Sequence, residues 1–469
     1  MTPLKTKLAA GVFSTLLLSA CSLAPDYERP KLPTPDAWPQ DTKAETGKSL
    51  WSDMAWKQFF TDPNLQALIQ LSLDNNRDLK VAALNIEVAR ATYRIADSNL
   101  FPHVSANGGE TAQLTPKALS STVPQAAAVT RTYSANLGVS AFTLDLFGKI
   151  RSLDEQALES YLATEEARRA TQITLISEVA NAYLTLLGDQ KLLALTEETL
   201  DTRTKSLELI QKSFEHGVSS ELDLAQARTL LETAKADRAM YLRQVAQARN
   251  ALVLLLGAQT DDVKLTGDLE KMTFVEDLSP GLPSDVLLRR PDIIEAEHSL
   301  KAANAYIGAA RANFFPSISL TGTFGLASPS LDNLFKGASK AWSFTPAASL
   351  PLFDAGSNFA TLDSAKASRD IQVATYEKTI QTAFREVSDA LAAKATYGDQ
   401  IAAQTALVDA TKTSLRLSQA RYDHGVDSYL NLLDAQRSLF TAQQSLISLQ
   451  VSKLSNMVTL YQVLGGGVN

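Results

Sequence analysis

Two long stretches of the chain have the composition of uninterrupted helices. Residues 150–214 and 357–421 contain no proline, and their only glycines are Gly188 and Gly398. A helix of about 65 residues is on the order of 100 Å long, which is too long for a compact globule. The composition therefore predicts an extended, mainly helical fold.

Shorter helices are expected beside the long ones, over 64–98 and 218–256, with a similar pair in the second half of the chain. Placed end to end, two shorter helices match one long helix. This predicts a tall cylinder whose wall mixes continuous helices with stacked pairs. The helices are rich in Ala, Ser, Gln and Leu, which permits close packing, although a set of ordinary coiled coils would show the same composition.

Strands are predicted at about 102–146 and 315–353, where apolar and polar residues alternate with a period of two. Strands of about ten residues with one apolar face suit a barrel in an outer membrane, and they also suit a soluble sandwich. The apolar positions are Tyr133, Ala135, Leu137, Val139 and Ala141 in the first stretch, and Ile318, Leu320, Phe324, Leu326, Trp342, Phe344, Leu350 and Leu352 in the second.

Four strands per chain are too few for a barrel with an open lumen, and exposed strand edges would aggregate. The economical arrangement is a ring of several chains, each contributing four strands, with closed cyclic symmetry.

The chain also repeats itself. The stretch FEHGVSSELDLAQAR recurs as YDHGVDSYLNLLDAQR, which pairs Gly217 with Gly425, and an earlier stretch pairs Asp78 with Asp292. Each unit holds a shorter helix, two strands, a long helix, a tight glycine turn and another helix. The predicted fold class is therefore mixed α+β with an internal two-fold structural repeat.

The first twenty residues have the features of a secretory signal, with Lys5 and Lys7 before a short apolar run and small residues before Cys21. The stretch LSAC is similar to a bacterial lipobox. That similarity implies cleavage before Cys21 and attachment of S-diacylglycerol and N-acyl lipid. Ser22, rather than Asp, points to the outer membrane in the lipoprotein pattern. A buried cysteine at the end of a signal helix is the alternative.

Composition and motifs exclude several functions. The net charge of −7 argues against nucleic acid as a partner, and a single cysteine cannot form a disulfide within the chain. The sequence has no nucleophile elbow, P-loop, His-Glu-x-x-His or paired-cysteine motif, and its four histidines lack metal-ligand spacing. After the signal, no apolar run of about 18 residues could form a membrane helix. We expect no catalytic site, no metal and no cofactor apart from the lipid.

The whole mature chain resembles the TolC family of outer-membrane efflux proteins, and most closely its lipidated OprM-like (NodT-type) branch. The stretches that carry the resemblance are CSLAPDYERP (21–30), GLPSDVLLRRPDI (281–293), FFPSISLTG (314–322), FREVSDAL (384–391), GVDSYLNLLDAQRSLF (425–440) and LYQVLGGG (460–467). The resemblance implies a homotrimer with a twelve-stranded barrel in the outer membrane, a long helical barrel in the periplasm and an equatorial belt. It also implies a periplasmic adaptor and an inner-membrane, proton-driven RND pump as partners.

The domains expected on this basis follow the repeat. They are a signal peptide (1–20), a lipidated N-terminal segment (21–60), a first repeat (61–257), a linker and equatorial segment (258–285) and a second repeat (286–467). In the linker region, Arg289 and Arg290 stand beside Asp285 and Asp292. We expect these residues to organise the belt where the repeats join.

The two glycine turns are predicted to reverse the chain at one end of the cylinder. Glycine at positive φ ends a helix, and Ser219, Ser220, Asp427 and Ser428 are candidate caps for the next one. In the resembled family this end is the periplasmic tip, which docks the adaptor. The tip residues so implied are Gly217, Val218, Ser219, Gly425, Val426 and Asp427.

The resemblance also implies a gate at this tip. The positions matching Leu430 and Asp434 form constricting rings in the OprM-like pattern, and those matching Tyr422 and Arg437 tether the closed tip. Three crowded Asp434 carboxylates would repel one another or hold a cation. From the residues alone, Asp434 could simply pair with Arg437 three positions on.

His216 and His424 both precede a turning glycine. They could sense periplasmic acidification, although a solvated histidine near a helix C-terminus is the plainer interpretation.

The predicted function is a passive outer-membrane exit duct for drugs or other toxic small molecules. A secretion duct of the type I kind and a structural or adhesive lipoprotein remain the alternatives.

Overall fold

A computed structural model describes residues 22–35, 37–39, 54–116, 128–258, 265, 267–275 and 283–467. Cys21 and the signal segment therefore lie outside the described residues. The chain divides into two compact units, which we treat separately. The sheet unit comprises Met1–Pro30, Ile86–Thr164 and Glu295–Tyr376, and the hairpin unit comprises Lys31–Asn85, Glu165–Ile294 and Glu377–Asn469. Among the described helices, none has enough length and apolar character to cross a membrane.

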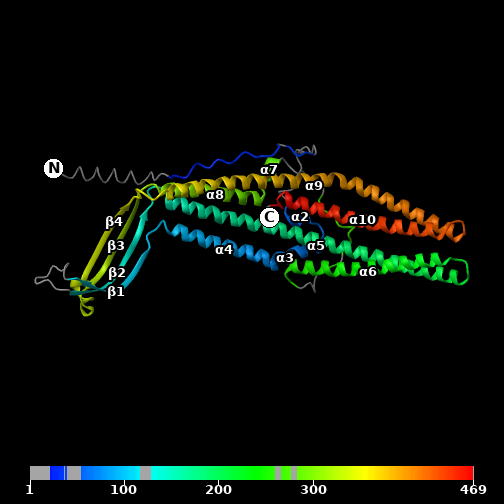
Figure 1. Cartoon of the computed structure of the whole chain (residues 1–469), viewed down its shortest axis with the longest axis horizontal. Helices are drawn as coiled ribbons and strands as arrows, with labels where there is room; N and C mark the ends of the chain where they lie inside the picture. The colour runs from blue at the N-terminus through cyan, green and yellow to red at the C-terminus, as the bar shows by residue number, and fades with distance from the viewer. Residues whose placement is uncertain are drawn as a thin grey trace. The chain divides into compact units, whose positions relative to one another are not determined.

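The described part of the sheet unit contains one four-stranded antiparallel sheet (Figure 1). Its strands follow chain order, so that the central pair joins the first repeat to the second. The strands are β1 (Val104–Thr115), β2 (Ala128–Leu144), β3 (Ser317–Ser328) and β4 (Lys340–Ser349).

Cross-strand register confirms the predicted alternation along most of the sheet. Leu137 lies opposite Phe324, which lies opposite Trp342, so these side chains share one face. Phe324 is 68% exposed and Trp342 is 76% exposed in the single chain. The expected strand positions Leu350 and Leu352 fall beyond the end of β4, which stops at Ser349, just before them.

Ala141 does not continue the alternation predicted for β2. The β2–β3 register shifts between Val139 and Phe142, and Ala141 has a φ of 54°. Its N–H donates to Thr321 Oγ1 at 3.1 Å instead of to a strand carbonyl. This bulge, which the sequence analysis missed, locally increases the bend and twist of β2.

The two long helices have nearly the predicted bounds. They are α5 (Lys149–Glu215) and α9 (Ser357–Asp423). The helices that follow the turns are α6 (Glu221–Leu256) and α10 (Tyr429–Val463), so α6 begins three residues later than predicted. Before β3 lies α8 (Pro291–Ala312). The short elements are α2 (Trp56–Phe59), α7 (Pro283–Leu287) and the 3-10 turns η3 (Leu331–Asn333) and η4 (Gly337–Ser339).

The single helix predicted over 64–98 is wrong. The chain forms α3 (Pro63–Asn75) and α4 (Arg77–Ser98), separated by Asn76 in an extended conformation with ψ of 135°. The Asn76 side-chain oxygen accepts from the N–H groups of Asp78 and Leu79, at 2.9 and 3.0 Å, and so caps α4. Its amide donates to Leu255 O at 2.9 Å, so the break is also tied to the end of α6.

Arg290 links three parts of the second repeat within the hairpin unit, whereas the expected role of Arg289 and Arg290 in a belt where the repeats join stays a prediction. Arg290 is buried and donates to Asp292 and Glu386, with shortest distances of 2.7 and 3.0 Å. It also donates to Val463 O at 2.8 Å, which links the start of α8 to α9 and to the end of α10. The Asp285 side chain lies outside the described part of the chain.

Candidate functional site

Both hairpins of the hairpin unit reverse through the same backbone geometry. Gly217 has a φ of 74° and Gly425 a φ of 69°. In the first turn, the Val218 N–H donates to Ser213 O at 2.8 Å, and in the second, the Val426 N–H donates to Arg421 O at 2.9 Å. Each glycine N–H also donates three residues back, which completes a Schellman motif. The predicted role of the two glycines as helix terminators is confirmed.

In the first hairpin, Ser220 restarts the helix. Its Oγ accepts from the Asp223 N–H at 3.1 Å, while the Asp223 carboxylate accepts from the Ser220 N–H at 3.0 Å. This reciprocal pair is a capping box for α6. Ser219, the other candidate, does not occupy the capping position.

The second hairpin is held differently. Ser428 stands at the N-cap of α10, but its side chain makes no capping hydrogen bond. Instead, Asp427 accepts from Arg421 Nε at 2.6 Å and from Asn431 Nδ2 at 3.1 Å. The hydrogen bond from Arg421 lowers the pKa of Asp427 below its usual range, and the same bond raises the pKa of Arg421. The sequence analysis identified Asp427 but missed its partner, Arg421.

One apolar cluster packs the two hairpins against each other above the turns. Tyr422, at the end of α9, packs on this cluster, and its ring centroid lies 5.4 Å from that of Tyr429. Burial raises the pKa of Tyr429 to about 12. Tyr422 therefore contacts a partner within its own chain. The buried members of the cluster are Ile210, Leu224, Ala227, Leu230, Tyr429, Leu432 and Leu433.

The predicted gate residues lie on a single exposed face of α10. Leu430, Asp434 and Arg437 are all exposed, while Leu432 faces the other way and is buried, and Leu433 is buried at the border of the exposed face. Leu430 is 55% exposed. In the described part of the chain, no ion pair forms between Asp434 and Arg437, so the plain local pairing considered from the sequence is not present.

The turns themselves present apolar side chains to solvent. Val218 is 81% exposed and Val426 is 63% exposed. Leu222 and Leu430, each in the first turn of the helix that follows its hairpin turn, are exposed as well. Large exposed apolar side chains gathered at one place are typical of contact surfaces. His216 and His424 are also exposed, and their suggested role as pH sensors stays a prediction.

Arg203 on α5 is a residue of this region that the sequence analysis missed. It is only 5% exposed and donates to Leu230 O on α6 at 3.0 Å. Its guanidinium lies over the ring of Phe440 on α10. Burial lowers the pKa of Arg203, the nearby positive charge of Arg437 adds to this effect, and Asp237 opposes it. Nothing in a single sequence distinguishes such an arginine from the exposed cations of the same helix.

The fold and the hairpin tip together define an outer-membrane efflux protein. The profile of the outer membrane efflux protein family matches residues 68–258 and 282–466, which shows that the chain belongs to this family. The match falls in two segments, in agreement with the internal repeat.

Individual relatives are similar over almost the whole chain. The chain is 51% identical to the probable efflux pump outer membrane protein TtgC of Pseudomonas putida, over 99% of this chain and 96% of that one. It is 44% identical to the outer membrane protein OprJ of Pseudomonas aeruginosa, over 98% and 96% of the two chains. The open-state MtrE outer membrane channel of Neisseria gonorrhoeae superposes with a TM-score of 0.86 at 39% identity, over 95% of this chain and 98% of that one.

These comparisons confirm the predicted class and location. The chain is the outer-membrane channel component of an efflux system in a Gram-negative bacterium, with a large periplasmic portion. Its family consists of efflux channels rather than enzymes.

Proposed function

We propose that the protein is the passive exit duct of a tripartite RND efflux system, and that three copies form it. Each copy would supply four strands to a twelve-stranded barrel and its long helices to a periplasmic helical barrel. The observation that carries this proposal is the open sheet, in which β1 and β4 each have one described neighbour and the apolar face is exposed. Closing the sheet across copies would pair both edges and place the apolar face against lipid.

Electron microscopy of the detergent-solubilised protein, with particles averaged down the long axis, tests this assembly. A hollow tube with threefold symmetry is the expected result. Compact or solid particles would reject the duct and favour the structural or adhesive alternative.

The exposed face of α10 supports a gate. Three Leu430 side chains would form an apolar constriction, and three Asp434 carboxylates would form a charged ring beside it. Crowded together, these carboxylates would repel one another or would share a cation. Arg437 is exposed on the same face and free to reach a neighbouring copy, while Tyr422 would support the gate from within its own chain through Tyr429.

The turns are the proposed docking site for the periplasmic adaptor. Val218 and Val426 present apolar surface there, and the Schellman geometry at Gly217 and Gly425 holds them outward. Ser219 and Asp427 border this surface with polar groups. An apolar contact ringed by polar groups fits a protein partner.

The lipid is proposed at Cys21, as S-diacylglycerol with an N-acyl group on the new terminus. Mass spectrometry of the N-terminal peptide from the membrane-purified protein tests this directly. A peptide that begins at Cys21 and carries the mass of the lipid is expected, and an unmodified Cys21 would contradict it.

The cargo is proposed to be apolar or drug-like small molecules. Relatives at 51% identity are named as an antibiotic efflux pump protein and a toluene efflux pump protein, both of Pseudomonas putida. Deletion of the gene should increase susceptibility to several unrelated antibiotics and to toluene, and complementation should restore resistance. Normal resistance together with loss of a secreted polypeptide would instead identify a secretion duct.

A further inference from the structure

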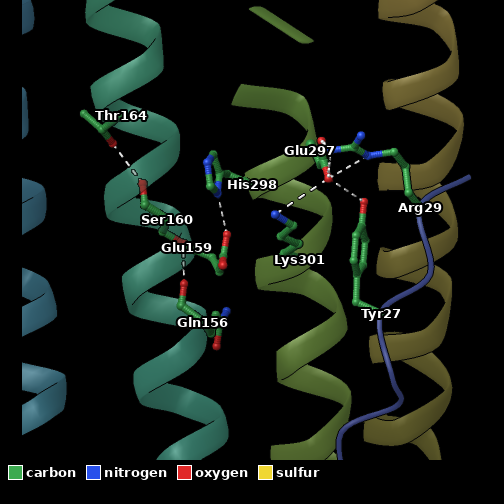
Figure 2. A network of polar contacts seen from close by, with 9 residues as sticks. All are labelled: Tyr27, Arg29, Gln156, Glu159, Ser160, Thr164, Glu297, His298 and Lys301. Carbon is green, nitrogen blue, oxygen red and sulfur yellow. Dashed lines mark hydrogen bonds and ion pairs between the residues drawn. The ribbon is translucent and has the colours of Figure 1, made fainter. Parts of the chain in front are cut away.

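The N-terminal segment Leu23–Arg29, here called the strap, lies extended along α8 in the sheet unit. The strap ends in a polar cluster around Glu297, which is only 5% exposed. Glu297 accepts from Arg29 Nη2 at 2.8 and 2.9 Å through its two oxygens, and from Tyr27 Oη at 3.2 Å. Figure 2 shows both side chains reaching from the strap towards this one carboxylate.

Contacts continue from Glu297 along one line of α8. The Lys301 ammonium lies 5.4 Å from the centroid of the Tyr27 ring. Asn304 Nδ2 donates to Pro25 O at 2.8 Å, and Arg311 Nη1 donates to Leu23 O at 2.9 Å. We call this line the α8 stripe, and its members are Glu297, Lys301, Asn304, Gly308 and Arg311.

Gly308 forms a notch in the middle of the stripe. A Cβ atom at this position would lie 2.7 Å from Ala24 N and 2.9 Å from Ala24 Cα. It would also lie 2.5 Å from Ser152 Oγ on α5. Distances this short are not tolerated between unbonded atoms, so the strap backbone can lie here only against glycine.

The extended strap and the stretch of α8 that it follows have nearly the same length. The strap from Leu23 to Arg29 spans roughly 20 Å when extended. The α8 helix from Arg311 back to Glu297 spans roughly 21 Å. Because the lengths agree, strap residues one or two positions apart can each meet one residue per turn of α8, and the strap runs in the opposite direction to the helix. Such a match determines which strap residue lies opposite which residue of α8.

The internal repeat shows that the stripe is specific to one helix. The alignment that pairs Asp78 with Asp292 makes α4 the counterpart of α8. Ala83 then offers no carboxylate where Glu297 stands, and Arg94 fills the place of the notch. The α4 counterparts of the five stripe positions are Ala83, Glu87, Arg90, Arg94 and Asp97.

We propose that the α8 stripe is a dedicated docking site for the chain's own N-terminal segment, which it latches to the second repeat in a single register. The latch holds Leu23 at the end of α8 that leads into β3. The start of the strap is thereby held at the last turn of α8, close before β3 begins. If Cys21 carries the proposed lipid, only Ser22 separates the anchor from the latched segment. This last consequence rests on the proposed function, whereas the latch does not.

Chymotryptic cleavage after Tyr27 in the purified full-length protein measures the latch, with the new N-terminus at Glu28 followed by mass spectrometry. Glu297→Gln should accelerate this cleavage roughly tenfold or more, because charged hydrogen bonds to the strap are lost. Arg29→Gln removes the same contacts from the strap side without altering α8. The double variant should cleave no faster than the single ones, since the two residues act together.

The notch has its own test. Ser152→Ala removes the hydroxyl that a Cβ atom at position 308 would meet on α5. Gly308→Ala in that background therefore clashes only with Ala24 of the strap, and cleavage after Tyr27 should again accelerate. Arg94→Ala at the counterpart position on α4 should leave the rate unchanged. Glu159→Gln is the matched carboxylate control, because Glu159 bonds to His298 on the other side of α8 (Figure 2).

Register is tested by insertion. Gly-Ser placed between Pro25 and Asp26 separates the two halves of the strap and should expose Tyr27 to cleavage. The same insertion between Lys31 and Leu32, outside the strap, should behave as wild type. Wild-type cleavage rates in Glu297→Gln, Arg29→Gln and the Pro25–Asp26 insertion would overturn the latch. The assay uses neither transport nor lipid, so loss of efflux activity alone would bear only on the proposed function.

Discussion

The guanidinium of Arg203 on α5 lies over the ring of Phe440 on α10, with its central carbon 5.1 Å from the ring centroid. The same side chain donates to α6 through Leu230 O. This buried arginine of α5 therefore contacts both α6 and α10 and joins the first hairpin to the second. It has no carboxylate within ion-pair distance in the part of the chain that the structure describes, so its charge is held by a carbonyl and an aromatic face.

This arrangement predicts different outcomes for two substitutions of Arg203. Arg203→Ala removes the packing and leaves Leu230 O unpaired, which should cost about 2 kcal/mol. Arg203→Met fills most of the same space without a buried charge and should cost less, since replacing a buried charge by an apolar side chain of similar volume is often neutral. Thermal unfolding of the detergent-solubilised protein measures both. A Met variant less stable than the Ala variant would show that the charge itself stabilises the hairpins.

The proposed gate predicts leak when its exposed face is truncated. Leu430→Ala combined with Asp434→Ala should raise single-channel conductance in planar bilayers and should admit antibiotics that the resting channel excludes, because both constricting rings are removed. The matched control is Leu222→Ala in the first hairpin, where an exposed leucine stands at the counterpart position. Conductance that stays at the wild-type level in the double variant would remove Leu430 and Asp434 from the gate.

The open sheet predicts a strong difference between its two faces. Phe324→Lys places a charge on the exposed apolar face and should cost about 2–4 kcal/mol if this face meets the middle of the bilayer. Thr323→Lys alters the neighbouring residue on the other face, where Thr323 hydrogen-bonds to Ser343 at 2.7 Å. The amount of folded protein in the outer-membrane fraction measures the effect. Equal loss in both variants would mean that the apolar face does not contact lipid.

Local sequence features predicted the helices and turns well. The long helices follow from the absence of proline, and the turns follow from the tolerance of Gly217 and Gly425 for positive φ. The exposed face of α10 follows from the spacing of Leu430, Asp434 and Arg437. In each case a few neighbouring residues determine the result.

Features that depend on distant contacts could not be predicted. The helix break at Asn76 depends on Gly257, where a Cβ would lie 2.5 Å from Asn75 O. The strap was visible as a motif, but its partner Glu297 lies far along the chain, and no local pattern connects them. The second hairpin was predicted to be capped like the first, whereas the ion pair of Arg421 with Asp427 replaces the cap.

That ion pair makes a specific prediction about pH. Its hydrogen bond holds the pKa of Asp427 below the usual value of about 4, so the bridge stabilises the turn above that pH. The stabilisation is lost only as the pH falls through the lowered pKa of the folded state. Protection of the Val426 amide from hydrogen exchange should therefore stay constant between pH 5 and 8, after correction for intrinsic rates. Below about pH 4, protection should fall in the wild type.

Arg421→Gln provides the control for this titration. Without the guanidinium, the pKa of Asp427 returns towards its ordinary value, and the protection of Val426 should already be low at neutral pH and change little on acidification. The Val218 amide reports the first hairpin, where the Asp223 carboxylate caps α6 without an arginine partner, so the bridge is judged by the difference between wild type and Arg421→Gln at Val426. If protection at Val426 falls between pH 5 and 8 in the wild type, a group with a higher pKa controls the turn, and variants with Asn at His424 would then identify it.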